Sequence, residues 1–273
     1  MKKLILTIIA IVILAVSCSK EDNIQKIDTD VDLGFIGLNE GQLHNELLEI
    51  LMNNWTISDK DETSIVSEVH RILISNTTEF SKSNNFDHTE FLNQANACDE
   101  NTIKSQENIL QEGYLASIGI SPTLQAEIDN FVKTFYNISG SEHVEDIKEM
   151  LLEHYYSHIG KLSNEDKLLF GTMIDVAIHS AKFWFPVEQG GQNKYVEFKK
   201  KLSIIRNGND LDLRGFWSDI ILADAAGAVT TAAISLVNSG GLTAIPNPAL
   251  GGIPTAGVVA VIGGAGASIA KAI

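Results

Sequence analysis

Apolar residues recur at intervals of three and four along most of the chain after residue 38, which is the spacing of one face of an α-helix. The first stripe runs from Leu43 to Leu51, and Asn39 with Gln42 is placed as a capping box ahead of it. Further helices are expected from about Ser58 to Leu73, Thr89 to Ala97, Thr102 to Ile118, Ser121 to Phe135, Ser141 to Tyr155, Ser163 to Phe185 and Lys194 to Ile205. The sequence contains no long alternating pattern typical of strands, so residues 39–215 are predicted to form an all-α helical bundle.

The last part of the chain, residues 216–273, is predicted to form an apolar, Gly/Ala-rich helical hairpin. Two apolar segments are joined there by a turn rich in glycine and proline, and a polar, turn-rich boundary at 207–215 precedes them. Small residues take every fourth position in both segments, which lets two helices approach closely. This expected packing seam consists of Ala223, Gly227, Thr231, Ser235, Ala256, Ala260, Gly264 and Ser268.

The hairpin can be buried either within the protein or in a lipid bilayer, and the two cases imply different functions. Each segment would be about 30 Å long as a helix, which is close to the thickness of a hydrocarbon core. Asp219 and Asp224 lie in the first segment, and an Asp at the bilayer centre costs about 2.5–3.5 kcal/mol on insertion scales. We therefore expect the hairpin to pack on itself or against the bundle. The alternative is a glycine-zipper-like hairpin that inserts into a bilayer or assembles with copies of itself.

The N-terminus has the pattern of a secretory signal. Two lysines precede an uncharged, mainly apolar run from Leu4 to Val16, which is shorter than the about 20 residues that span a bilayer as a helix. The run Leu14–Cys18 resembles the lipobox of bacterial lipoproteins. This resemblance implies that residues 1–17 are a removed signal peptide and that Cys18 carries the lipid. Residues 18–38 are acidic and poor in large apolar side chains, so they are predicted to be a lipidated flexible tether.

Two further resemblances concern the localisation of the protein. The residues after the lipidated cysteine, Ser19, Lys20, Glu21 and Asp22, resemble the export tag of surface-exposed lipoproteins of the Bacteroidota. The run Gly41–Glu46, together with Trp217 and Asp219 before the Gly/Ala-rich tail, is similar to uncharacterised lipoproteins of the same group. These resemblances imply an outer-membrane protein that faces the cell exterior, with a periplasm-facing anchor as the alternative. They imply no activity.

The charge balance argues against nucleic acid as a partner. The chain has 35 acidic and 20 basic residues and a formal charge of −15, whereas phosphate binding depends on clustered lysine and arginine. The one dense basic run, Lys199–Lys201, is expected on a solvated helix face.

We find no catalytic motif and expect no cofactor, because the sequence has neither a glycine-rich phosphate loop nor a nucleophile elbow. With Cys18 lipidated, Cys98 is the remaining thiol, and we expect it to be a small buried or unpaired residue. His88 is the histidine nearest to it in the sequence, and a catalytic pair between them is the less favoured reading.

His154 and His158 are weak candidates for a metal site. They are four residues apart on an expected helix, as helical zinc ligands are. The sequence does not fix a third ligand, for which His179 and Glu153 are the candidates, so polar surface histidines are the favoured interpretation.

Two other groups have open interpretations. The aromatic residues Phe183–Phe185 and Trp217 are expected to complete a core, with a ligand groove as the alternative. His44 and Asn45 adjoin the first leucine stripe and form either a polar site or satisfied groups on a helix surface.

Taken as a whole, the sequence indicates a helical protein held to the membrane by an N-terminal lipid. We expect it to act as a binding module for a protein or small-molecule partner. A membrane-active protein that uses its C-terminal hairpin is the alternative, and a metal-dependent enzyme comes third.

Overall fold

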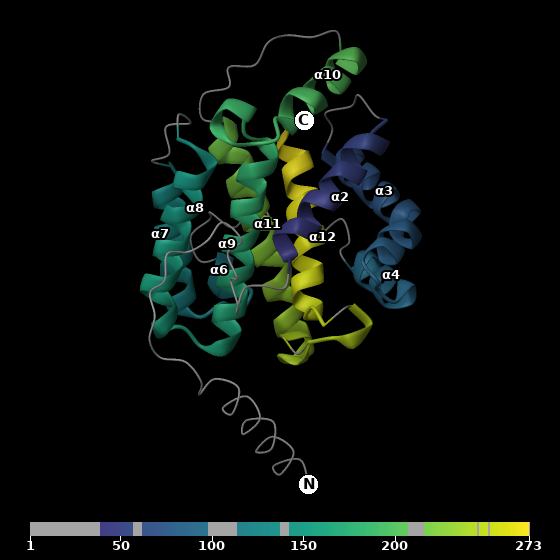
Figure 1. Cartoon of the computed structure of the whole chain (residues 1–273). Helices are drawn as coiled ribbons and strands as arrows, with labels where there is room; N and C mark the ends of the chain where they lie inside the picture. The colour runs from purple at the N-terminus through teal and green to yellow at the C-terminus, as the bar shows by residue number, and fades with distance from the viewer. Residues whose placement is uncertain are drawn as a thin grey trace. The chain divides into compact units, whose positions relative to one another are not determined.

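The computed structural model describes residues 39–56, 62–97, 114–136, 142–206, 216–244, 246–250 and 252–272 (Figure 1). Within these ranges the regular structure is helical, apart from an isolated antiparallel bridge between Pro246 and Pro254. The prediction of an all-α fold is therefore confirmed. The expected leader and tether, Cys98 and the expected boundary at 207–215 lie outside the described residues.

The described helices come in the predicted order. Their bounds are α2 Glu40–Asn54, α3 Glu62–Ser83, α4 His88–Ala97, α6 Tyr114–Ser117, α7 Pro122–Tyr136, α8 Val144–His158, α9 Asn164–Trp184, α10 Lys194–Arg206, α11 Phe216–Ser239 and α12 Thr255–Ala272. Helix α3 continues to Ser83, beyond the expected Leu73, and α8 follows an N-cap at His143 and not at Ser141. The part of the expected helix Thr102–Ile118 before residue 114 lies outside the described residues. Short 3-10 turns at Ile159–Lys161, Val187–Gln189, Leu242–Ala244 and Pro248–Leu250 occupy several of the connections.

Two predicted helix starts are confirmed by their caps. The Ser121 hydroxyl accepts a hydrogen bond from the backbone N–H of Leu124 at 3.1 Å, and Ser163 accepts one from Asp166 at the same distance. The predicted capping box at the start of α2 is wrong. Asn39 has a left-handed backbone with φ 62° and makes no side-chain cap.

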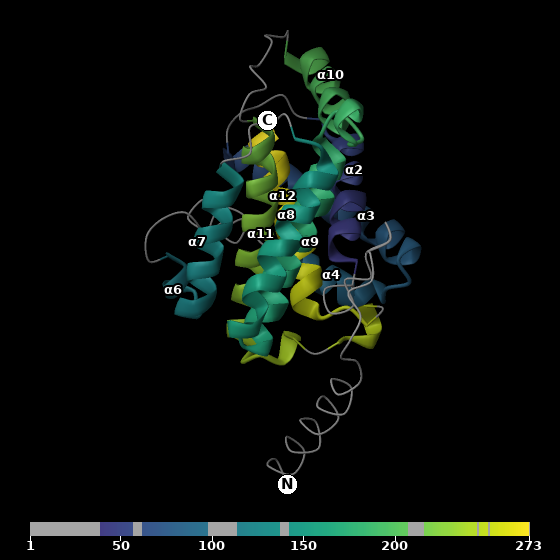
Figure 2. The ribbon, with the colours of Figure 1, turned by 60° about the vertical axis from the view of Figure 1, so that its left-hand side comes forward.

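Helices α11 and α12 form the predicted hairpin and run side by side through the middle of the described helices (Figures 1 and 2). Helix α9 packs on α11, and α2 packs on α12 and on α9. Helices α3 and α4 contact α12 beyond α2, whereas α7 and α8 lie on the side of α9. The hairpin is thus at the centre of the compact unit to which the described residues belong.

The four central helices α2, α9, α11 and α12 bury an aliphatic and aromatic core. Its members include Leu47, Leu48, Leu51, Phe170, Ile174, Ala177, Ile220, Val229, Val258 and Ile262, none more than 1% exposed. Burial of a large apolar side chain contributes about 1.5–3 kcal/mol. The hairpin therefore supplies a large share of the stabilisation of the bundle.

The turn of the hairpin is fastened to α4. The carbonyl of Ala249 accepts a 2.6 Å hydrogen bond from the backbone N–H of Asp87, just before α4. The Asn247 side chain donates to Glu90 of α4 at 3.3 Å and to Thr255 at 3.1 Å. These bonds hold the turn against the bundle although its backbone is rich in glycine and proline.

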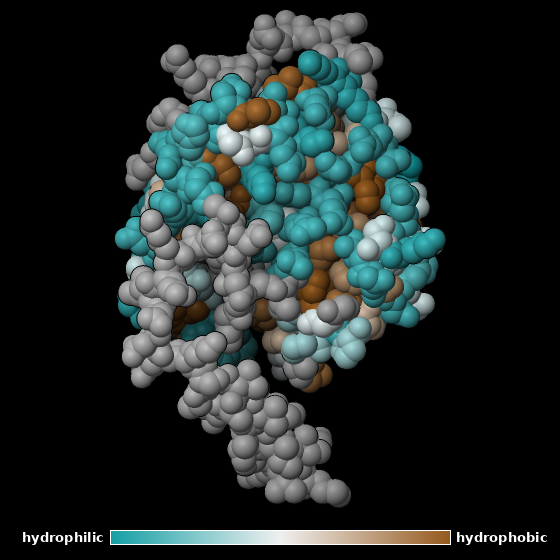
Figure 3. All heavy atoms as spheres, in the orientation of Figure 1, coloured by the Kyte–Doolittle hydropathy of each residue, from teal (hydrophilic) through white to brown (hydrophobic). Residues whose placement is uncertain are grey.

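Among the described residues, one helix is long and apolar enough to cross a membrane by length and composition, namely Asp219–Ser239 within α11. In this fold, however, 78% of its apolar window is buried by other parts of the protein. The face in Figure 3 is mostly hydrophilic, with hydrophobic residues in small separate areas. On this face the described residues present a mainly hydrophilic surface.

Candidate functional site

The hairpin contacts its covering helices through a fully buried polar pair. His44 of α2 and Asp224 of α11 are both 0% exposed, and the His44 Nε2 lies 3.2 Å from the Asp224 Oδ1 in an ion-pair contact. His44 also points its Nδ1 at the Asn45 Oδ1, 3.1 Å away. These contacts place both ring nitrogens next to oxygen atoms, although the Nε2 and the Asp224 Oδ1 make no hydrogen bond among the described residues. Of the two interpretations of His44, the helix-surface group is wrong, because its side chain is fully buried.

Helix α9 completes the environment of Asp224. The Ser180 hydroxyl donates to the Asp224 Oδ2, and the Trp184 indole N–H donates to the same oxygen at 3.2 Å. Ser180 and Trp184 are also 0% exposed. The serine bonds the carboxylate and not the histidine, so the order differs from that of a nucleophilic triad. The arrangement connects three helices, and its burial separates it from solvent.

A second polar contact lies nearer to the start of α2. The carboxyl group of Asp175 accepts a 2.7 Å hydrogen bond from the backbone N–H of Gly41, and its other oxygen lies 3.7 Å from the His179 Nε2. The His179 carbonyl in turn accepts a 2.8 Å bond from the Asn45 amide. The two contacts are therefore joined through neighbouring residues of α2 and α9.

Burial changes the pKa values of the titratable groups at this second contact. Glu40 is 1% exposed and its Oε2 has no hydrogen-bond partner, and burial, with the nearby Asp175, raises the pKa of Glu40 to about 8. Burial also raises the pKa of Asp175 and lowers the pKa of His179. A buried carboxyl group that is neutral at pH 7 loses that neutrality on mild alkalinisation, so this contact depends on pH.

Glycines of α12 make room for these polar groups. A Cβ on Gly264 would lie 2.9 Å from the Asp224 carbonyl oxygen and 3.1 Å from the His44 ring. A Cβ on Gly257 would lie 2.7 Å from the Glu40 Oε1. A side chain at Gly264 would push against the backbone of α11, whereas one at Gly257 would displace the end of the Glu40 side chain.

The residues of the expected seam occupy different environments. Those within the interior are Gly227, Thr231, Ala256, Ala260, Gly264 and Ser268, whereas Ala223 and Ser235 are partly exposed. Gly263, which the seam omitted, lies in close contact with α11, because a Cβ there would lie 2.3 Å from the Thr231 side chain. This contact is one residue away from the expected repeat.

A small hollow lies where the hairpin turn meets the start of α9. Its volume is about 240 Å³, and it is lined by Gly119, Ile120, Glu165, Asp166, Leu169, Ala233, Leu236, Val237, Gly240 and Gly241. Val237 at its edge is 53% exposed, and the nearby turn residue Leu242 is 70% exposed. Ligand pockets for drug-sized molecules are about 300–1,000 Å³, so the hollow fits an apolar side chain of a partner better than a small molecule.

The other predicted groups are located as follows. Phe183, Trp184 and Phe185 are at most 1% exposed and complete the core as expected, while the side chain of Trp217 lies outside the described residues. Lys201 is not on a free solvated face. Its ammonium donates to the carbonyl oxygens of Met52, at 2.7 Å, and Asn53 at the end of α2.

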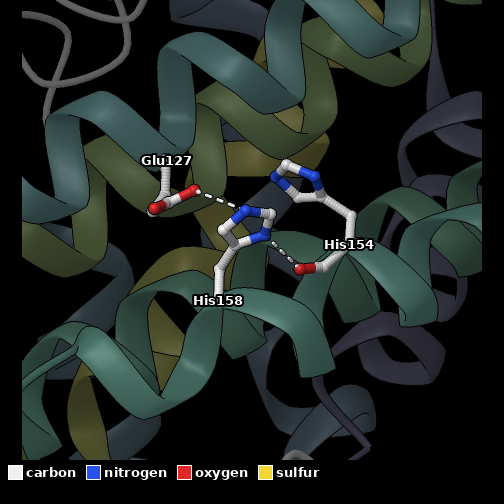
Figure 4. A group of neighbouring side chains, drawn as sticks. All are labelled: Glu127, His154 and His158. Carbon is white, nitrogen blue, oxygen red and sulfur yellow. Dashed lines mark hydrogen bonds and ion pairs between the residues drawn. The ribbon is translucent and has the colours of Figure 1, made fainter.

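His154 and His158 are half-buried on α8 and face a carboxylate (Figure 4). That carboxylate belongs to Glu127 of α7, and the three side chains offer ligand atoms within 4.8 Å of one another. The expected third partners are both wrong, because Glu153 is exposed and His179 pairs with Asp175. Glu127 was missed because α7 precedes α8 across a connection that the helical spacing does not orient.

Comparison with known proteins gives no relative: no family model, no curated protein and no solved structure matches the chain.

Proposed function

We propose that the protein is a lipid-anchored helical protein of the outer membrane, displayed at the cell surface, which acts by contact with a partner. The N-terminal pattern supports this localisation, since positively charged residues and an apolar run precede Cys18 and the tag Ser19–Asp22. A diacyl or triacyl cysteine anchors stably because each buried methylene contributes about 0.8 kcal/mol.

The single observation that carries the proposal is the burial of the hairpin. Helices α2 and α9 cover α11 and α12, and the His44–Asp224 pair lies inside this contact. A hairpin used in this way is the core of the folded body and is not available as the resting membrane anchor. Attachment then falls to the lipid on Cys18, and the surrounding helices remain in water for contact with a partner.

Cell fractionation tests the proposed localisation in the membrane. In a Bacteroidota host, Cys18→Ser should move the protein from the membrane to the soluble fraction, whereas Cys98→Ser should leave it in the membrane. Replacement of Lys20, Glu21 and Asp22 by alanine should keep the protein in the membrane but protect it from protease added to intact cells. A Cys18→Ser protein that remains in the membrane fraction would disprove lipid anchoring.

The hollow near the hairpin turn is the contact site that we favour for the partner. Its lining combines the exposed apolar Val237 with the carboxylate of Glu165, and the exposed Leu242 directly follows the lining residue Gly241. This combination suits an apolar side chain next to a basic group on a protein. A photo-crosslinking residue at Val237 should give one dominant adduct on cells, whereas the same residue at Tyr156, which is 54% exposed on α8, should not. Equal labelling at both positions would contradict a specific contact here.

One observation favours a second function, membrane activity of the hairpin. The apolar stretch Asp219–Ser239 is long enough to cross a bilayer. The other helix of the hairpin, α12, is covered by α2, where the titratable Glu40 lies next to Gly257, and the titratable Asp175 of α9 holds the start of α2. Loss of these contacts would free an apolar hairpin close to the membrane to which the lipid is attached.

A disulfide across α2 and α12 tests this second function directly. The Glu40 Cγ lies 3.2 Å from the position of a Cβ on Gly257, a distance that suits a disulfide sulfur. We would compare Glu40→Cys/Gly257→Cys, in a Cys98→Ala protein that lacks Cys18, before and after reduction. Membrane activity requires the reduced form to release dye from liposomes and the oxidised form to release none. Equal release by both forms, or release by neither, would exclude it.

A further inference from the structure

We propose that Glu127, His154 and His158 form a binding site for a divalent transition-metal ion of the zinc class (Figure 4). The site lies between α7 and α8, away from the hairpin contact. It is independent of the function proposed above. Two histidines and one carboxylate are a donor set that Zn²⁺ uses in proteins.

The hydrogen bond of His158 orients its ring for a metal. Its Nδ1 lies 2.7 Å from the carbonyl oxygen of His154 and donates to it. In the neutral ring this leaves the lone pair on Nε2, which faces the Glu127 Oε2 at 3.7 Å. Histidines that bind metals commonly donate their other N–H to a carbonyl or carboxylate in this way.

Glu127 contributes an unsatisfied oxygen. Its residue is 5% exposed, yet the Oε2 that faces His158 has no hydrogen-bond partner, and the same holds for the buried Nε2 of His154. Buried polar atoms without partners are destabilising by about 1–3 kcal/mol each. A cation between them would satisfy both. The ammonium of Lys161 lies 4.0 Å from the other carboxylate oxygen of Glu127, and the Lys161 side chain is 63% exposed.

Burial also prepares His154 as a ligand. Burial first, and then the neighbouring His158, lower the pKa of His154 and favour the neutral ring, although Glu127 acts in the opposite direction. The rings of the two histidines have centroids 4.6 Å apart and are inclined by 45°, so they can turn towards a common point. Phe170 of α9 packs edge-on against His154 at 5.7 Å and limits its other rotations.

The distances between the donor atoms are compatible with tetrahedral coordination of the ion. Zinc bonds of about 2.0–2.2 Å place tetrahedral donor atoms about 3.3 Å apart. The observed 3.7 Å between His158 and Glu127 and the 4.8 Å limit for all three therefore require only a modest side-chain contraction. Three protein ligands leave a fourth position for water or for a donor group from a partner.

Titration with Zn²⁺ and with Co²⁺ tests the site on the purified chain without its leader. We expect one ion per chain and the visible absorption of tetrahedral Co²⁺. His154→Ala and His158→Ala should each weaken binding by more than about 100-fold, because even outer partners of a metal site cost 10–100-fold. Glu127→Gln, which keeps the shape and removes the charge, should weaken it by at least about 10-fold. His70→Ala, on α3, is the matched control and should bind like the parent.

Circular dichroism of each variant separates loss of the ligand from loss of the fold. Two results would overturn the proposal. One is a parent chain that binds no Zn²⁺ or Co²⁺. The other is a set of folded ligand variants that bind these ions with the same stoichiometry and affinity as His70→Ala.

Discussion

The His44 Nε2 lies 3.2 Å from the Asp224 Oδ1, and neither side chain has any exposed surface. The pair joins the first described helix to the hairpin near the end of the chain. A buried pair is weak evidence for net stability, because the desolvation of two charges offsets their attraction. Its consequence is specificity, since a displaced hairpin would leave one charged group buried without the other.

Removal of one member of this pair should be strongly destabilising. Asp224→Ala leaves Ser180 and Trp184 without their shared acceptor and removes the ion-pair contact of His44. We expect the free energy of unfolding to fall by about 3–5 kcal/mol, measured by urea denaturation.

The control is the other acid of α11. Asp219 lies 3.6 Å from Lys271, but both side chains are about half exposed, so Asp219→Ala should change the free energy of unfolding by at most about 1 kcal/mol. If both variants unfold at the same urea concentration, the buried pair does not hold the hairpin.

The stability of the protein should decrease as the pH rises towards 9. Glu40 is protonated more readily in the folded state, where its pKa is about 8 against 4.5 for the free side chain. The contribution of Glu40 to the free energy of unfolding is fully present below pH 4.5 and is lost as the pH rises through 8. The loss amounts to roughly 5 kcal/mol at most. The raised pKa of Asp175 acts in the same direction.

The variant Glu40→Gln removes this effect. It should be more stable than the parent at pH 9 and should show a flatter dependence of the unfolding midpoint between pH 6 and 9. Glu165→Gln, at an exposed position of α9, should follow the parent. A parent whose midpoint stays constant across this range would contradict the account of Glu40.

The contact between Gly263 and Thr231 in the hairpin should not tolerate a methyl group. A Cβ on Gly263 would lie 2.3 Å from Thr231, so Gly263→Ala should destabilise the fold by about 1–3 kcal/mol despite the better helix propensity of alanine. Gly160 has no atom within 4 Å of such a Cβ, and Gly160→Ala should be neutral or slightly stabilising. Thermal unfolding of the two variants measures the difference, and equal midpoints would show that the hairpin can separate at Gly263.

The sequence predicted the features that depend on neighbouring residues. Ser121 and Ser163 cap their helices because the hydroxyl and the amide that it accepts from are three residues apart. The capping box predicted at the start of α2 was wrong for a long-range reason. Asp175 of α9 accepts from the backbone N–H of Gly41, so a distant carboxylate takes a role that the sequence assigned to a local cap.

The polar contacts of the hairpin were missed for the same reason. Helical spacing marks His44 as a polar residue beside a leucine stripe and Asp224 as an acid in an apolar helix, but spacing does not tell which helices meet. Each residue alone indicated only a polar position that departs from the apolar pattern of its own helix. Two isolated polar residues on apolar faces were the available signal, because each needs a partner once it is buried. The same limit hid Glu127, which is on a different helix from His154 and His158.

Hydrogen exchange along α11 and α12 tests the central claim, that the hairpin is the protein core held by α2 and α9. In water, without detergent or lipid, the amides of 220–236 and 256–269 should exchange as slowly as those of α9, because opening the hairpin requires unfolding of the unit around it. Rapid exchange of these segments in water, with protection that develops only when detergent or liposomes are added, would contradict the claim.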